Sequence, residues 1–448
     1  MKQRIDLLHG DIVPALGKLA LPIMATSFIQ MAYNLIDMIW IGRVGSGAVA
    51  AVGAAGMYMW LSDGLSTMAK MGGQVRVGQC LGAKAVEQAK IYAKSSIQLG
   101  IMFACLFGVC SILFADVMIG FFNLNGLQVI SDATIYLRIT CGFVIFSYMN
   151  QIMTGLFTAM GNSRVCFIAT STGLLVNLIL DPILIFGLMG LPKMSVLGAA
   201  LATLIAQMTV FCIYLFIAKK EVLFEHMQVW KGIHKEEVKN IVKIGLPTSL
   251  QSMLFSGMSM TIARMIAVWG DGAVAVQKVG SQIESISWMS AEGFAAAVNS
   301  FMAQNYGAKQ MDRLKKGYLS AVKIVAVWGI FCSVVLIAFP EVIFQIFIQE
   351  ADVLHMGIDY LRILGISQFF MCMEITTSGA FSGMGRTIPP SVVGIVLTAA
   401  RIPMAYFLSN TFLGLNGVWW SISISSILKG IVLVCWFVWF MNRQLKKI

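Results

Sequence analysis

Long apolar stretches, separated by short polar connections, run along the whole chain. A helix rises 1.5 Å per residue, so about 20 apolar residues cross the roughly 30 Å hydrocarbon core of a bilayer. Stretches of this length lie at residues 14–40, 47–70, 91–114, 135–157, 165–189, 195–218, 241–268, 274–297, 318–340, 358–380, 388–408 and 413–441. The pattern predicts an all-α integral membrane protein with twelve transmembrane helices.

The first span carries a stripe of polar residues on an otherwise apolar helix. Ser27, Gln30, Asn34 and Asp37 are spaced by three, four and three residues, so they share one helical face. A carboxylate inside a span costs about 2.5 to 3.5 kcal/mol on insertion scales, so Asp37 should face protein or water rather than lipid. We therefore expect the other spans to surround this stripe.

Composition and charge agree with a membrane protein. The chain is 58% hydrophobic and 12% charged, whereas soluble domains are about 25% charged. Lysine and arginine concentrate in alternate connections, at residues 2–4, 84–90, 164, 219–239, 309–316, 386 and 443–447. The positive-inside rule makes these connections and both termini cytoplasmic, as in a multi-pass protein of the bacterial inner (plasma) membrane. The net charge of +11 then reflects topology, and no nucleic-acid partner is expected.

Sequence motifs recur at a nearly constant distance. GAVA begins at Gly47 and again at Gly272, and LALP (IGLP in its second copy) and QCLGAKAVEQAK (QNYGAKQMDRLK) recur at the same offset. YLRI, at Tyr136 and Tyr360, and GLFTAMG (GAFSGMG) recur at an offset smaller by one. This regularity over several helices indicates an internal repeat of six spans. Since six is even, both halves have the same orientation, as in transporters with a central cavity between two lobes. We predict an N-terminal lobe at 1–219, a cytoplasmic linker at 220–239 and a C-terminal lobe at 240–448.

The fifth span supplies a second polar constellation. Asn177 and Asp181 are four residues apart and share a face, and Pro182 leaves a backbone carbonyl without its helical donor. With both termini inside, Asp37 lies at a compatible depth and could meet Asp181. Two nearby carboxyl groups in a low dielectric hold a proton readily, and such oxygen ligands also suit a small hard cation. The alternative is that both residues have structural roles, Asp181 as an aspartate beside a helix kink and Asp37 as one at the membrane interface.

The second half offers an internal comparison. At the offset of the GAVA repeat, the positions equivalent to the polar stripe hold Ser252, Phe255, Ser259 and Ile262, so the acid is lost there. If Pro182 is matched with Pro403, the residue equivalent to Asp181 is Ile402, and Arg401 is its neighbour. We therefore expect ion coupling to reside in the first half.

Substrate contacts are predicted on spans one, seven and eight. The candidates are Gln30, Met31, Tyr33, Asn34, Ser259 and Glu284. Glu284 is near mid-depth in its span, where it is either a contact for a cationic substrate or a hydrogen-bonded packing residue. Glu374 and Lys429 both fall in the inner half, where a structural ion pair is the favoured interpretation.

No metal centre, cofactor or enzymatic activity is expected. The nine cysteines lie mostly inside apolar spans without a CxxC motif, and the four histidines fall in connections. No constellation of nucleophile, base and metal ligands is visible.

Several motifs together resemble the multidrug and toxic compound extrusion (MATE) family. They are LALPIM, YNLIDMIWIGRVG, LGAKAVEQA, AMGNSR, NLILDPILIFG, LGAALAT, AFSGMGRT and ARIPMAYFL. The resemblance implies export of diverse, often cationic, compounds in exchange for H⁺ or Na⁺. It is closer to the DinF-like branch, whose coupling residues carry over onto Asp37, Asn177 and Asp181 (the Na⁺ site where Na⁺ is the ion), with Thr203 as a fourth member. The NorM-like branch has an acid where this chain has Phe255.

Two functions of different kinds follow from the sequence. The first is a monomeric, ion-coupled antiporter that exports cationic or amphipathic small molecules. The alternative is a flippase for a lipid-linked or amphipathic precursor, for which a more basic cavity would be expected. A major facilitator transporter shares the six-plus-six repeat, but the connection after the second span lacks the Asp-Arg signature of that family.

Overall fold

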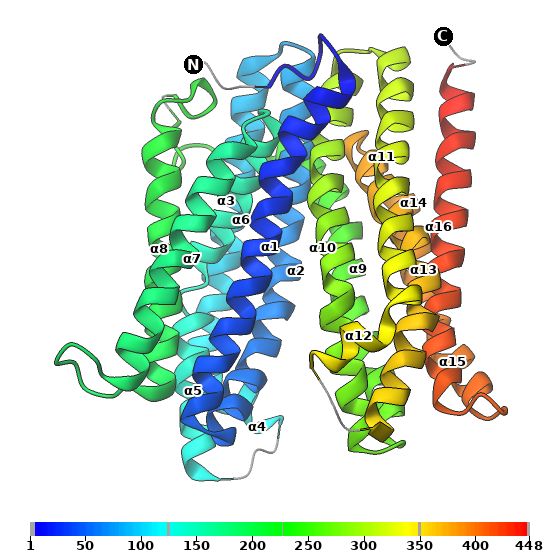
Figure 1. The fold of residues 1–448 in the computed structure, drawn as a ribbon. Coiled ribbons are helices and arrows are strands. Elements are labelled where there is room, and N and C mark those ends of the chain that lie inside the picture. The colour runs from blue at the N-terminus through cyan, green and yellow to red at the C-terminus, as the bar shows by residue number, and fades with distance from the viewer. Residues whose placement is uncertain (1–4, 123–125, 226, 348–350, 446–448) are drawn as a thin grey trace. The chain divides into compact units, whose positions relative to one another are not determined.

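A computed structural model describes residues 5–122, 126–225, 227–347 and 351–445, leaving out the side chains of residues 34, 35, 38, 46, 271, 351, 352, 444 and 445. Within these ranges the chain forms helices and no strands (Figure 1). Seven of the helices are long and apolar enough to cross a membrane, and the bent pair α5 and α6 would make eight. Each of the twelve predicted spans falls on a helix or a pair of helices.

The helices of the first half are α1 (Ile12–Val44), α2 (Ser46–Gly82), α3 (Val86–Leu113), α4 (Ala115–Gly120), α5 (Leu127–Thr140), α6 (Ile145–Ala159), α7 (Ser163–Phe186) and α8 (Ser195–Ala218), followed by the 3₁₀ turn η1 (Val222–Phe224). Those of the second half are α9 (Lys235–Ala267), α10 (Asp271–Gly307), α11 (Met311–Ala338), α12 (Pro340–Gln345), α13 (Ala351–Gly383), α14 (Ile388–Ala399), α15 (Arg401–Ser409) and α16 (Leu415–Leu445).

Packing groups the described chain into two compact units. The first consists of Ile5 and Ala25–Ser249, and the second of Asp6–Met24 and the described residues from Leu250 onward. Helices α1 and α9 are therefore each divided between the units, two residues after Pro22 and Pro247 respectively. The N-terminal part of each of these helices groups with the helices of the other half, and the lobes at 1–219 and 240–448 stay a prediction.

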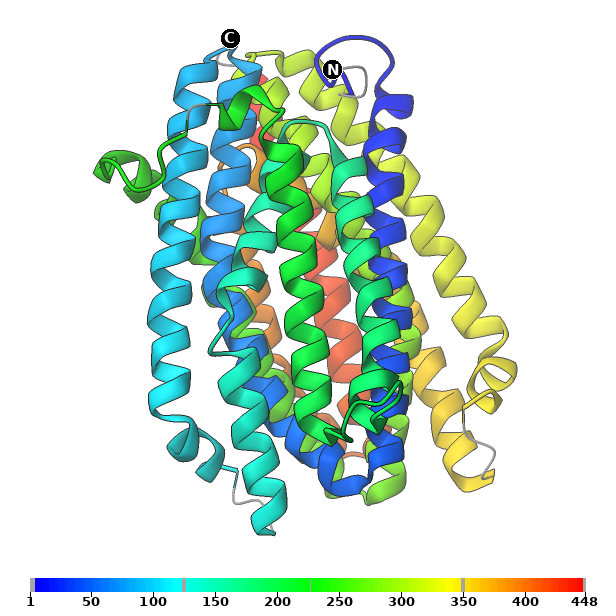
Figure 2. The same ribbon diagram turned by 90° about the vertical axis from the view of Figure 1, so that its left-hand side faces the viewer.

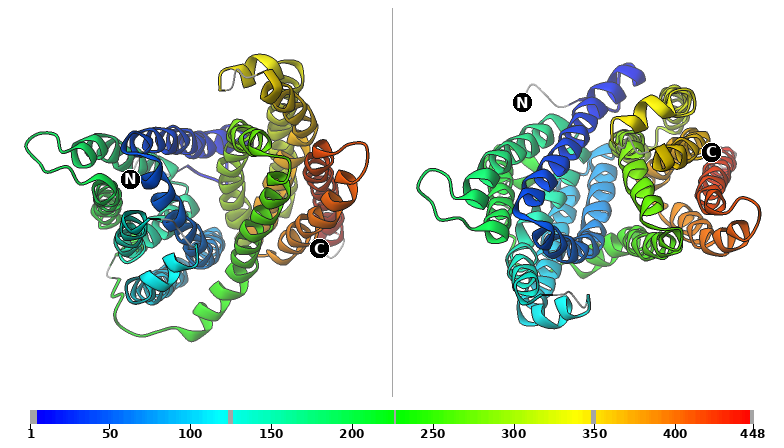
Figure 3. Two further views of the ribbon diagram at one scale, coloured as in Figure 1. Left: turned by 90° about the horizontal axis from the view of Figure 1, so that it is seen from below. Right: turned by 60° about the horizontal axis from the view of Figure 1, so that its bottom comes forward.

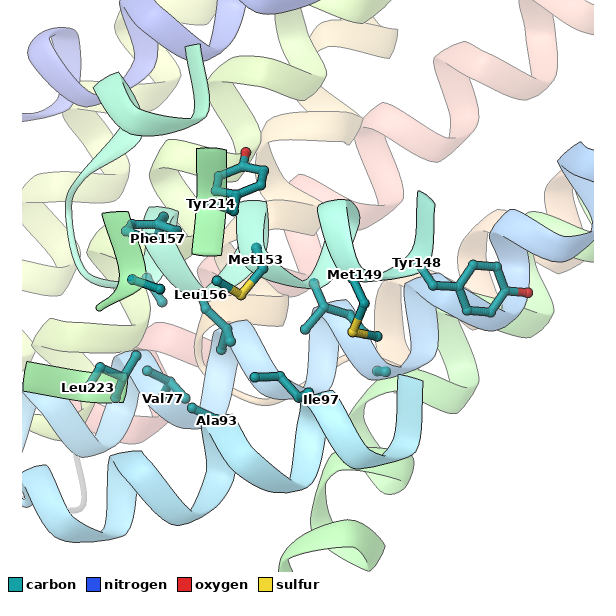
Figure 4. Close-up of a cluster of buried hydrophobic side chains, with 14 of the residues drawn as sticks. Val77, Ala93, Ile97, Tyr148, Met149, Met153, Leu156, Phe157, Tyr214 and Leu223 are labelled. Carbon is teal, nitrogen blue, oxygen red and sulfur yellow. The ribbon is translucent and has the colours of Figure 1, made fainter. Parts of the chain in front are cut away.

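The interior of the first unit is a dense apolar cluster from α2, α3, α6 and α8. Figure 4 shows side chains of these helices interlocking, and the ring centroids of Phe157 and Tyr214 lie 5.6 Å apart in a stacked arrangement. Lipid tails are as apolar as these side chains, so close van der Waals contact, rather than transfer from water, favours such packing inside a membrane. The cluster gives α7 and α8, which run side by side (Figure 3), a rigid support.

The predicted span at 135–157 is broken in two. Helices α5 and α6 meet at an angle of 46° across residues 141–144 (Figure 2). A Cβ atom on Gly142 would lie 2.0 Å from the carbonyl oxygen of Arg138, so only glycine fits this backbone. The bend leaves α5 packed against α8.

The two units hold corresponding apolar clusters. Tyr360 and Leu361 of the second unit are the repeat equivalents of Tyr136 and Leu137, and both pairs are buried in their clusters. The offset between the two pairs is 224 in residue number. In both halves a glycine packs against the backbone of a leucine, Gly198 against Leu184 and Gly417 against Leu408.

The pairing of Pro182 with Pro403, which sets Ile402 opposite Asp181, stays a prediction, because the corresponding span of the second half is divided into α14 and α15 at Ala400.

The close approach of α9 to α2 can be tested with alanine. A Cβ on Gly245 would lie 2.0 Å from the carbonyl oxygen of Met68, whereas a Cβ on Gly257 of the same helix would meet nothing within 4 Å. We expect Gly245→Ala to lower the free energy of unfolding by about 1 to 3 kcal/mol through overpacking. Gly257→Ala should leave stability unchanged or raise it by up to about 1 kcal/mol. Thermal unfolding of both variants in detergent measures the difference. Equal melting temperatures would contradict the close contact between α9 and α2.

Candidate functional site

The site is built on α7, where two polar side chains are buried one turn apart. Asn177 is 2% and Asp181 1% exposed, and the Nδ2 group of Asn177 donates to Oδ1 of Asp181 at 2.7 Å. Both face the same side of the helix, as their spacing predicts. Pro182 follows directly, and α7 ends shortly afterwards at Gly187, whose left-handed φ of 74° suits glycine.

Helix α1 contributes a tyrosine that fixes the asparagine. The hydroxyl group of Tyr33 donates to Oδ1 of Asn177 at 2.5 Å. Since Asn177 accepts through Oδ1 and donates through Nδ2, its amide orientation is set by both neighbours. A continuous chain of hydrogen bonds therefore runs from α1 through Asn177 to Asp181.

The carboxyl groups of Asp37 and Asp181 face each other within hydrogen-bonding range. Oδ1 of Asp37 and Oδ2 of Asp181 are both buried, and neither has a hydrogen-bond partner. Two adjacent carboxylates repel each other strongly away from water, and unpartnered buried oxygens are unfavourable. A proton shared by the pair, or a cation held between them, removes both penalties.

Two hydroxyl-bearing residues complete the site. The side chain of Thr203 on α8 lies next to the hydroxyl groups of Tyr33 and of Tyr136 on α5, and Tyr136 is 5% exposed. Sequence reasoning named Thr203 through the family resemblance only, and it missed Tyr136 as a site residue. The signal was present in the YLRI motif, which begins with Tyr136 and recurs at Tyr360.

The remaining predicted residues lie on α1, α9 and α10. Gln30 and Met31 are half-buried on α1, and the side chain of Asn34 lies outside the described residues. Ser259 is exposed on the part of α9 that belongs to the second unit. Glu284 is buried in α10 near Tyr360 and Gln368, and its Oε1 atom has no hydrogen-bond partner. The structure therefore brings together Asp37, Asn177, Asp181 and Thr203, with Tyr33 from the predicted substrate group.

The donor set limits what the site can bind. It consists of carboxylate, amide and hydroxyl oxygens, which suit a proton or a hard cation rather than a soft metal ion. Among the described residues no cluster of three or more His, Cys, Asp or Glu side chains could hold a metal ion.

The family model MatE matches the chain twice, at residues 22–183 and 247–407. The two matches start at Pro22 and Pro247 and end at Ile183 and Phe407, so they follow the internal repeat of the sequence.

Individual relatives are similar over nearly the whole chain. A probable multidrug resistance protein NorM of Thermotoga maritima is 28% identical over 91% of this chain and 88% of its own length. An FAD transporter of Shewanella oneidensis is 23% identical over 98% and 96%. A crystal structure of MATE in complex with MaL6 superposes with a TM-score of 0.92 at 25% identity, covering 100% of both chains.

The bond between Tyr33 and Asn177 can be measured by a double-mutant cycle. Tyr33→Phe leaves the buried Oδ1 of Asn177 without its donor, which should cost about 1 to 3 kcal/mol of unfolding free energy. In an Asn177→Ala background the same change should cost at least about 0.5 kcal/mol less. Unfolding in denaturant measures each variant, with Tyr406→Phe, at an exposed position on α15, as the control. Additive effects would show that the two side chains do not interact.

Proposed function

The chain belongs to the MatE family, and from this premise we propose that it is a secondary active antiporter, exporting cationic or amphipathic small molecules in exchange for H⁺ or Na⁺ by alternating access. The observation that carries the proposal is the pair Asp37 and Asp181, with one unpartnered buried oxygen on each. Such a site is unfavourable without an ion, so it binds one from the side of the membrane where the ion is more concentrated. It releases the ion on the other side, where the ion is less concentrated.

The proposed topology follows from the sequence and the helices. The chain is a multi-pass membrane protein, and we propose twelve spans in two lobes, 1–219 and 240–448, joined by a cytoplasmic linker at 220–239. Both termini are cytoplasmic in this arrangement, the membrane is the bacterial inner membrane, and the protein works as a monomer. The basic connections and the two matches to one family model support the arrangement.

The proposed coupling step centres on the two carboxyl groups. A proton binds between Asp37 and Asp181 and gives each unpartnered oxygen a hydrogen-bond contact. For Na⁺ the ligands are Asp37, Asp181 and the second lone pair of Asn177 Oδ1, whose first lone pair is taken by Tyr33. Thr203 and Tyr136 supply hydroxyl groups next to the acid pair. This use of the first half alone is what the DinF-like resemblance implies.

The proposed substrate contacts begin on the same helix. Gln30, Met31 and Tyr33 precede Asp37 on α1, so ion binding and substrate binding act on one element. Exchange of one monovalent cation for one H⁺ moves no net charge, so the driving force is about 1.4 kcal/mol per pH unit. Exchange of H⁺ for a neutral compound also uses the membrane potential, at about 2.3 kcal/mol per 100 mV.

A second candidate is movement of an amphipathic anion or a lipid-linked precursor. The observation in its favour is the similarity to a relative named FAD transporter, because FAD is a negatively charged amphipathic molecule. Buried Arg401 and Lys429 in the second unit supply positive charge, but Lys429 is paired with Glu374, and Arg401 donates to the hydroxyl groups of Ser425 and Ser426.

The antiport proposal predicts loss of coupled transport in two variants. Asp37→Asn and Asp181→Asn each remove a carboxylate from the pair, so export of a fluorescent cationic dye should fall at least about tenfold, matching a loss of about 1.4 kcal/mol or more. The dye is followed in everted vesicles under a pH gradient alone and a Na⁺ gradient alone. Asp132→Asn, on the exposed end of α5, is the matched control and should transport normally.

The parent protein separates the two candidates. Dye movement under one gradient identifies the coupling ion. Movement of FAD without dye movement would favour the anionic substrate. Undiminished dye export by Asp181→Asn would refute the role of the acid pair.

A further inference from the structure

Residues 229–233, which we call the linker turn, fold back along α3 (Figure 2). Gln98 of α3 donates through Nε2 to two carbonyl oxygens of the turn, at 2.6 and 3.2 Å, and Lys94 donates through Nζ to a third. The accepting residues are Val229, Gly232 and Lys231. All of these residues belong to the first unit, so the contact is made within one compact body.

The linker turn reaches the depth of a membrane span. Nearer the start of α3, Gln88 donates to Oε1 of Glu237, in the first turn of α9, at 3.2 Å. Gln98 lies ten residues further along α3, which is about 15 Å at 1.5 Å per residue. The linker therefore descends along α3 by about this distance and returns before α9 begins. Lys94 and Gln98 both fall inside the span predicted at 91–114, whereas the sequence predicts a cytoplasmic linker.

The same face of α3 is apolar and exposed beyond this point. Lys94, Gln98, Met102 and Leu106 follow one another at intervals of four residues, so they lie on one face of the helix. Met102 and Leu106 are exposed, and α3 is long and apolar enough to cross a membrane, so this face meets lipid. The change from Gln98 to Met102 marks the edge of the hydrocarbon layer, and the linker turn is bound at that edge.

The end of α8, from which the linker starts, shows the same boundary. Phe216 is exposed in the last turn of α8, and the Nζ atom of Lys220 lies 4.8 Å from the centre of its ring. An exposed aromatic ring beside a lysine is typical of a membrane–water interface, because the stem of the lysine stays in the apolar layer while its charge reaches water. The linker therefore begins at the edge of the membrane.

The hydrogen bonds from α3 suit this location. Irregular backbone at membrane depth must find hydrogen-bond partners in the protein, because water is scarce there. Lys94 and Gln98 supply such partners to three carbonyl oxygens of the turn. The tight return of the chain uses Gly232, whose φ of 64° is the left-handed conformation that glycine adopts most readily.

The linker turn presents two large apolar side chains away from the protein. Trp230 is 86% and Ile233 72% exposed, although their neighbours Met227 and Val229 pack against the apolar cluster of the first unit. Tryptophan is enriched at membrane interfaces, since its ring is apolar and its N–H group donates to polar headgroups. Lys231 is exposed between the two apolar side chains, and the turn contains no acidic residue. The outward side of the turn is therefore apolar and positively charged.

We propose that the linker turn is a phospholipid-binding anchor of the surrounding bilayer. Trp230 and Ile233 lie among the acyl chains just below the headgroups, and Lys231 binds a lipid phosphate group. An anionic lipid is favoured, because the turn has a positive charge and no acid to neutralise it. The anchor holds the connection between the two halves of the chain at the membrane surface. It does not depend on the antiport function proposed above.

Fluorescence quenching locates Trp230. The chain has ten tryptophans, so the emission of Trp230 is measured as the difference between the parent and Trp230→Phe. Both proteins are reconstituted into vesicles of phosphatidylcholine and phosphatidylglycerol. One quencher is lipid brominated near the headgroup end of its acyl chain, and the other is iodide on both sides of the membrane. Brominated lipid should quench the difference signal, and iodide should leave most of it.

Two results of this experiment would overturn the proposal. Quenching by iodide without quenching by brominated lipid would place the turn in water. Protection from both quenchers would show that protein covers the turn, as a second copy of this chain would. Trp439→Phe, at an exposed position on α16, is the control, and its difference signal should be quenched by brominated lipid.

The hydrogen bonds from α3 are tested by removing them. In Lys94→Met/Gln98→Leu the turn loses its three donors, so the Trp230 signal should become more sensitive to iodide and less sensitive to brominated lipid. The signal is measured against the same variant carrying Trp230→Phe. Gln88→Leu, which removes only the bond to Glu237, should leave the signal as in the parent. An unchanged signal in the double variant would show that α3 does not hold the turn at this depth.

The choice of lipid tests Lys231. When the bromine is carried either by phosphatidylglycerol or by phosphatidylcholine, the Trp230 signal of the parent should be quenched more by the anionic lipid. Lys231→Gln should lose this preference, whereas Lys239→Gln, an exposed lysine of α9, should keep it. Equal quenching by both lipids in the parent would refute the binding of an anionic lipid at the turn.

Discussion

The hydrogen-bond chain from Tyr33 through Asn177 to Asp181 is the interaction on which the site depends. It joins α1 to α7 and fixes the amide, so that Asp181 presents one satisfied and one unpartnered oxygen toward Asp37. Without this chain, two buried carboxyl groups would separate or draw in water. With it, they stay close, and each keeps one buried oxygen without a partner.

Helix α1 extends beyond the site. Its C-terminal part holds Tyr33 and Asp37 in the first unit, while Asp6–Met24 belongs to the second. The segment before the helix is firmly held, since Arg313 donates to the carbonyl oxygens of Leu7, His9 and Gly10. In the antiport proposal, a change in the charge of the acid pair therefore acts on a helix whose other end is anchored in the second unit.

Much of the fold and part of the site could be predicted from the sequence. Apolar length located every span on a helix, and the four-residue spacing of Asn177 and Asp181 placed them on one face. The contacts of Tyr136 could not be predicted, because they depend on the break at residues 141–144 and on the packing of α5 against α8.

A buried acid in a membrane protein can be neutralised by an exchangeable ion or by a fixed side chain. Asp37 and Asp181 each have a buried oxygen without a hydrogen-bond partner, and this is why we propose an ion there. Glu374 instead has Lys429 at 3.0 Å, so a tethered cation balances its charge. The two acids of the pair therefore need a partner from outside the chain, whereas Glu374 does not.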